Sequence, residues 1–236
     1  MVAKDVLNLN TLGSNTITNI GGVFNLNNLT NLNALNMIRL EQVKEINWVA
    51  LQALDFPTFT SNVTKVSKVS IQNTFLSSLT GINLVTVQSL DISNNNRLRT
   101  FAADLGNVTQ SLVIGTNGKN LEVSFPDLVW AANMTFRNVS SVDLPSLAVV
   151  NGSLGFYGNY LTDVKAPKLT SVGAFATGQG SLAFVANSKL TEIDMPLLKT
   201  VGGAAQIANN TMLANITFPA LESVGGAVDF SGTFGT

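Results

Sequence analysis

One sequence motif occurs twice between residues 198 and 230, and this repetition restricts the possible folds more than any other feature of the chain. The motif contains a valine and two glycines between apolar residues in a fixed order. Its copies begin at Leu198 and Leu221, an offset of 23 residues, and the same order recurs near the other end, from residue 17 to residue 26. A unit this short cannot bury an apolar face alone. The pattern therefore predicts a stack of coils in which each coil contacts only its neighbours, spanning residues 1–236 as one repeat array.

Apolar anchor residues mark one strand in each expected coil. Successive anchors are 20 to 28 residues apart, and in most coils a second apolar residue lies two positions earlier. That alternation predicts short strands with two inward side chains, and frequent Gly, Pro and β-branched residues disfavour helix. We therefore expect an all-β fold, a parallel β-solenoid of about ten coils of the leucine-rich-repeat or β-helix type. The anchors are Leu26, Trp48, Ile71, Ile92, Ile114, Phe136, Phe156, Phe184, Ile207 and Phe230.

An asparagine follows the anchor by three residues in five of the coils. An inward asparagine at a corner can donate and accept hydrogen bonds where the turn buries backbone groups that no strand satisfies. We expect these residues to form a structural ladder between coils and not a catalytic site. They are Asn95, Asn117, Asn159, Asn187 and Asn210.

The coil between Phe156 and Phe184 is about six residues longer than the others, and its surplus falls in the segment 173–180. Tyr157 and Tyr160 precede this insertion, while Phe175 and Gln179 lie within it. Aromatic rings near an irregular loop can stack on a sugar, but they more often hold the loop against the body of the protein. We regard Tyr157, Tyr160, Phe175 and Gln179 as candidate binding residues.

Eight Asn-x-Ser/Thr sequons are candidate N-glycosylation sites, and none has proline in its middle position. Only 11% of the residues are charged, so attached glycans would help to solvate the surface. The asparagines are Asn28, Asn62, Asn107, Asn133, Asn138, Asn151, Asn209 and Asn215.

Composition argues against several functional classes. The 13 basic and 14 acidic residues provide no positive excess for nucleic acid, and the chain has no cysteine or histidine. We expect no metal, no cofactor and no catalytic residues. The carboxylates Asp143 and Asp194 occupy equivalent positions around Lys165 and are expected to form an exposed charge ladder, which carries little energy.

The sequence also resembles a known family. Residues 125–133, 152–156 and 201–211, together with residues 46–49 and 92–98, are similar to fungal GPI-anchored cell-wall-organisation glycoproteins of the sporulation-specific and extracellular-mutant group. That group has repeats like those of the receptor L-domain. The resemblance covers nearly the whole chain, and the stretch Leu128 to Ala131 is its most specific part.

The resemblance implies a secreted, glycosylated protein of the fungal cell surface or wall, with no catalytic residues to transfer. We expect a non-catalytic protein that supports wall organisation and integrity, with wall polysaccharide or wall proteins as partners. A carbohydrate-binding or adhesive module is the alternative, and a polysaccharide-active β-helix enzyme is the third. The secretion signal, stalk and anchor of the family are not found in this sequence, so we expect a fragment whose membrane attachment is a GPI anchor in a longer parent.

Overall fold

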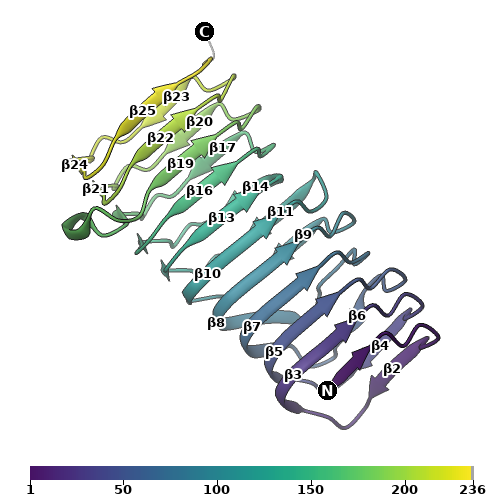
Figure 1. Ribbon diagram of the computed structural model, residues 1–236. Helices are drawn as coiled ribbons and strands as arrows, with labels where there is room; N and C mark the ends of the chain where they lie inside the picture. The colour runs from purple at the N-terminus through teal and green to yellow at the C-terminus, as the bar shows by residue number, and fades with distance from the viewer. Residues whose placement is uncertain (235–236) are drawn as a thin grey trace.

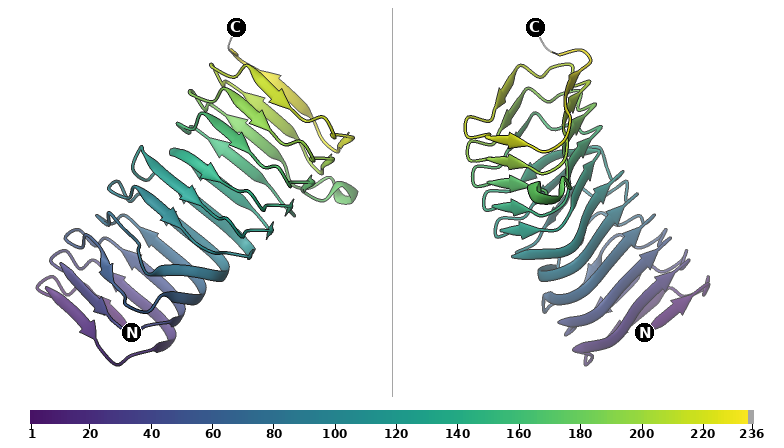
Figure 2. Two further views of the ribbon diagram at one scale, coloured as in Figure 1. Left: turned by 180° about the vertical axis from the view of Figure 1, so that it is seen from behind. Right: turned by 60° about the vertical axis from the view of Figure 1, so that its left-hand side comes forward.

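The computed structural model describes residues 1–234, and its strands stack as a parallel β-solenoid of about ten coils. Figures 1 and 2 show an elongated body with the first and last coils at opposite ends. Every strand pairing is parallel, because each coil returns the chain to the same face one rung further along. The expected fold class is confirmed. The one helical segment in the described residues is a single 3-10 turn, η1 (Phe175–Thr177).

A 16-stranded sheet forms two sides of the solenoid. Its first part contains short β1 and five long strands that curve from one side to the other. After the fifth long strand the sheet forks into two branches of short strands, the anchor branch and the lower branch. The first part contains β1 (Val2–Lys4), β3 (Asn19–Asn27), β5 (Gln42–Val49), β7 (Val63–Gln72), β8 (Ile82–Ser93) and β10 (Asn107–Gly115). The anchor branch contains β13 (Met134–Arg137), β16 (Leu154–Tyr157), β19 (Leu182–Val185), β22 (Ala205–Ala208) and β25 (Val228–Ser231). The lower branch contains β12 (Trp130–Ala131), β15 (Val149–Val150), β18 (Ser171–Val172), β21 (Thr200–Val201) and β24 (Ser223–Val224).

Three separate three-stranded sheets form the remaining side. The first contains β2 (Thr11–Ser14), β4 (Ala34–Met37) and β6 (Pro57–Thr58). The second contains β9 (Thr100–Ala102), β11 (Leu121–Ser124) and β14 (Val139–Asp143). The third contains β17 (Asp163–Lys165), β20 (Glu192–Asp194) and β23 (Asn215–Thr217). No ladder pairing joins β14 to β17 within residues 1–234, so this side is interrupted between them.

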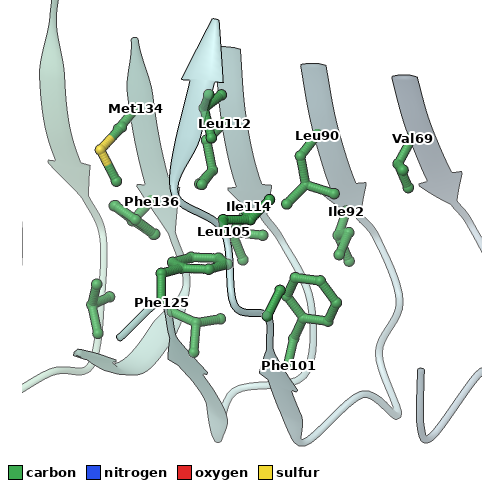
Figure 3. Close-up of a cluster of buried hydrophobic side chains, with 14 of the residues drawn as sticks. Val69, Leu90, Ile92, Phe101, Leu105, Leu112, Ile114, Phe125, Met134 and Phe136 are labelled. Carbon is green, nitrogen blue, oxygen red and sulfur yellow. The ribbon is translucent and has the colours of Figure 1, made fainter. Parts of the chain in front are cut away.

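The anchor residues pair in register along the sheet and point into one continuous core. Phe136, Phe156 and Phe184 stack in successive coils, with ring centroids 5.2 Å and 4.9 Å apart. Figure 3 shows the middle of this core. Phe101 of β9 and Phe125, which directly follows β11, lie there near anchors such as Ile114. Each coil therefore buries its apolar side chains against the coils above and below, as the repeat predicted.

A left-handed residue follows the anchor-bearing strand in every coil. This corner requires positive φ, which asparagine, aspartate and glycine tolerate better than other residues do. The sequence supplies one of these three types in eight of the eleven coils. The corner residues are Asp5, Asn28, Ala50, Asn73, Asn94, Thr116, Asn138, Gly158, Ala186, Asn209 and Gly232.

The residue after that corner points inward, and here asparagines form hydrogen-bonded ladders. Asn187 is buried, and its Nδ2 donates both to Phe156 O (3.0 Å) and to Asn210 Oδ1 (3.0 Å). In turn, its Oδ1 accepts from Asn159 N and Asn159 Nδ2. Asn95 and Asn117 form a second ladder in which Thr74 is the first member.

The two ladders are separated by Val139, which holds the inward corner position between Asn117 and Asn159. Valine has no side-chain hydrogen-bonding group, so the bonds toward the preceding coil are missing, whereas Asn159 of the following coil still bonds Val139 N and Phe136 O. Asn138 replaces part of the missing bonding to the preceding coil, because its Nδ2 donates to Asn117 O at 2.7 Å.

Candidate glycan sites and binding surfaces

The eight sequon asparagines lie on the surface, but their side chains differ in accessibility. Six of them are exposed, and four of these six lie away from the left-handed corners and make no side-chain hydrogen bond within residues 1–234. Asn62 and Asn107 lie at the start of long strands, Asn151 follows β15, and Asn215 opens β23. Their amide nitrogens can carry a glycan without displacing any packed group.

The other four sequons are tied to the corners of the solenoid. Asn28 and Asn138 are half-buried left-handed residues whose Nδ2 atoms donate to Asp5 Oδ1 (2.8 Å) and Asn117 O (2.7 Å). Asn209 is an exposed left-handed residue. Asn133 is exposed, yet its Oδ1 accepts from Ser153 N and its Nδ2 donates to Gln110 O. These asparagines have a structural role whether or not they carry glycans.

The long coil forms a closed loop that projects from the side of the solenoid, where the 3-10 turn is visible in Figures 1 and 2. Ala174 and Gln179 close it through an antiparallel bridge, with Ala174 N donating to Gln179 O at 2.8 Å. A Cβ atom at Gly202 would lie 2.4 Å from Gln179 O, so the loop base packs directly on the glycine corner of the next coil. The side chain of Phe175 lies outside the described part of the structure.

Tyr157 and this loop lie at opposite ends of the strands in the anchor branch. Tyr157 pairs with Val185, the last residue of β19, whereas the loop ends before Leu182, the first residue of that strand. The Tyr157 ring covers Gly155, where an added Cβ would be 2.3 Å from the ring, and the Arg137 guanidinium lies 4.4 Å from its centroid. A shallow hollow of about 390 Å³ borders Tyr157 and Arg137.

Tyr160 lies beyond the next corner, where the Lys189 ammonium is 5.9 Å from its ring centroid. The structure thus distributes the four candidate binding residues over two places, with the tyrosines at one corner and Gln179 in the loop at the opposite end of the strands. Each place would have to bind a ligand by itself.

The charged side chains of the second and third small sheets do not form the ladder that we expected from Asp143, Lys165 and Asp194. Lys165 aligns with Asp194 in the strand register, but its ammonium contacts Asp163 (3.3 Å) and Glu192 (3.2 Å). The hydrogen bond to Glu192, followed by that to Asp163, raises the pKa of Lys165. Asp143 instead accepts from Ser124 Oγ at 2.9 Å. Among residues 1–234, no three His, Cys, Asp or Glu side chains gather as they would around a metal ion.

A groove of about 560 Å³ lies where the five long strands curve, and the sequence analysis did not identify it. Its floor is formed by Val43, Val66 and Val87, whose side chains face the core. Polar residues precede and follow each of these valines, as in Gln42 and Lys44. The alternation was visible in the sequence, but it did not show that the strands curve there.

Within residues 1–234, the structure has no helix with the length and apolar character needed to span a membrane. No protein-family model matches the chain. No solved structure matches it either.

Several curated fungal proteins are similar in sequence. A cell surface GPI-anchored protein of Arthroderma benhamiae is 43% identical over 142 residues, which is 60% of this chain and 35% of the relative. Protein ecm33 of Aspergillus fumigatus is 49% identical over 167 residues, 70% of this chain and 40% of the relative. Sporulation-specific protein 2 of Saccharomyces cerevisiae is 34% identical over 142 residues, 60% of this chain and 27% of the relative. The matched part is thus less than half the length of each relative, and the resemblance to this fungal group is confirmed.

Proposed function

Because the chain is a homologue of fungal GPI-anchored cell-surface proteins, we propose that it is a non-catalytic, glycosylated structural element of a fungal cell wall. The whole protein would reach the wall or plasma membrane through a GPI anchor in its longer parent. The sequence similarity to protein ecm33, at 49% identity, carries the proposal.

The fold supports this role through its stiffness. Parallel strands and a continuous core connect each coil to the next, and two asparagine ladders add bonds over part of the array, so the solenoid can act as a stiff spacer. Four exposed sequons with free amides provide places for glycans that would embed such a spacer in a hydrated wall.

A complementation experiment tests the proposal. Deleting the parent gene should make cells sensitive to wall-perturbing dyes, and the wild-type gene should restore growth. Restoring it with Asp143→Asn and Asp194→Asn together should rescue equally well, because the two carboxylates lie on separate small sheets, Asp143 exposed and Asp194 half-buried, and we assign neither to a reaction centre. If the double variant reaches the surface folded but does not rescue, the non-catalytic role is wrong.

A carbohydrate-binding module is the second candidate function. It is favoured by the groove along the long strands, whose polar side chains make no hydrogen bond to other groups in the described residues 1–234. Binding and structural support are separable, because groove substitutions leave the core and the ladders unchanged.

A further inference from the structure

Two rows of polar side chains line the groove along the solenoid axis. The first row is in direct strand register over five coils and therefore repeats at each rung, roughly every 4.8 Å. The second row lies two positions later in the same strands. The first row is Asn19, Gln42, Lys65, Thr86 and Asn107; the second is Lys44, Ser67, Gln88 and Thr109, with Gly21 at the corresponding position of the first coil.

The hydrogen-bonding groups in both rows are free. Within residues 1–234, none of these side chains makes a hydrogen bond or an ion pair with another protein group. Amides elsewhere on the surface are paired between coils, as Asn47 is with Asn25 (3.3 Å) and Gln72 is with Asp91 (2.6 Å). The groove is thus a surface on which polar side chains repeat along the axis without satisfying one another.

The hydrogen-bonding groups in the two rows favour ligands that carry hydroxyl groups. Amides such as Gln42 and Gln88 offer both a donor and an acceptor, which suits hydroxyl groups, since a hydroxyl both donates and accepts. A phosphate or sulfate only accepts, so it could pair with Lys44 and Lys65, which also donate readily to hydroxyl oxygens, but it would leave the oxygens of the groove amides without a partner. A protein partner would need apolar anchors, but the apolar residues lining the groove, Val43, Val66 and Val87, are themselves buried.

The axial repeat further specifies the form of the ligand. Five rungs present hydrogen-bonding side chains in register over roughly 19 Å, so a polymer with a short, regular repeat can make a hydrogen bond at each coil. We propose that the groove binds an unbranched neutral polysaccharide chain laid along the solenoid axis. This proposal rests on the carbohydrate-binding function given above as the second candidate and adds the class of ligand and its orientation, whereas the spacer role does not depend on it.

The proposal predicts that binding depends on chain length and on the groove amides. Affinity for soluble β-glucan or chitin oligosaccharides, measured by calorimetry, should rise with the number of rings until the chain spans the five coils, and then level off. Gln42→Ala with Gln88→Ala should weaken binding about tenfold or more, because two direct hydrogen bonds are lost. The measurement is made in an Asn107→Gln background, which keeps an amide there while preventing glycan attachment at the end of the groove.

A matched control removes two glutamines outside the groove. Gln72→Ala with Gln206→Ala should leave binding unchanged, although both glutamines are half-buried amides on the same sheet. Ser67→Phe, which fills the groove, should abolish binding while the circular dichroism spectrum stays the same. The proposal is wrong if neither oligosaccharide series binds, if the control pair weakens binding as much as the groove pair, or if dextran sulfate binds more tightly than both in a salt-dependent manner.

Discussion

At the scale of single residues, a few side chains have roles that their neighbours cannot replace. Asn187 satisfies Phe156 O and Asn159 N, two backbone groups of the preceding coil, while its own backbone N–H is satisfied by Asn210 in the following coil. No regular strand pairing reaches these groups at the corner. A buried amide is therefore required there for its hydrogen-bonding capacity.

Replacing Asn187 by leucine should destabilise the protein, because it leaves buried donors and an acceptor unpaired at roughly 1–3 kcal/mol each. Denaturant unfolding measures the loss. Asn96→Leu is the control, since Asn96 is exposed at a comparable corner and makes no side-chain hydrogen bond in the described structure. Equal stability of Asn187→Leu and wild type would show that the ladder contributes nothing.

Ile207→Asp should be still more damaging. Ile207 is 1% exposed, and a carboxylate there would be unpaired in an apolar core, a change expected to cost more than about 4 kcal/mol. Gln206→Lys tests the orientation, because Gln206 points outward from the same strand opposite Asp229 and should tolerate a positive charge. Thermal melting distinguishes the two variants, and similar melting temperatures would contradict the inward assignment.

At the scale of elements, the projecting loop is attached to the solenoid without being part of its core. The ends of the loop almost meet, since a Cβ built at Gly180 would be 2.5 Å from Gly173 Cα. The strands on either side, β18 and β19, pair with their neighbours independently of it.

Removing residues 174–179 should therefore leave the fold intact and change the unfolding free energy by about 1 kcal/mol or less, because a shorter loop costs little closure entropy. Circular dichroism and denaturant titration provide the measurement. The deletion should also rescue cells that lack the parent gene. Loss of rescue by a folded, surface-located deletion variant would instead indicate a specific binding site in the loop.

Strand positions could be predicted from the sequence because one period governs burial in every coil. The ladder asparagines were also visible, since they keep a constant distance from the anchors. Thr74 was missed because a threonine at that position is not distinctive in sequence. The groove was missed because its curvature depends on bulges, such as the register shift between Ile20 and Val23, that no residue type specifies.

At the scale of the whole molecule, stability is the sum of contacts between adjacent coils. The core is continuous along the described chain, and Phe136, Phe156 and Phe184 stack across the middle. The last coil differs, because Phe230 and Val228 are 54% and 55% exposed and contact a coil on one side only.

The interruption at Val139 also has a mechanical consequence. The ladder of Asn95 and Asn117 ends at this coil, and the small sheet that contains β14 does not continue into β17. A tensile load applied along the axis would be shared by three sides of the solenoid at most rungs. Between β14 and β17 the load passes to the two larger branches of the sheet and to the side chain of Asn159, which bonds Phe136 O and Val139 N. A stretched solenoid would therefore extend first where the small sheets are interrupted, between β6 and β9 and between β14 and β17, because only two of its three sides are paired there.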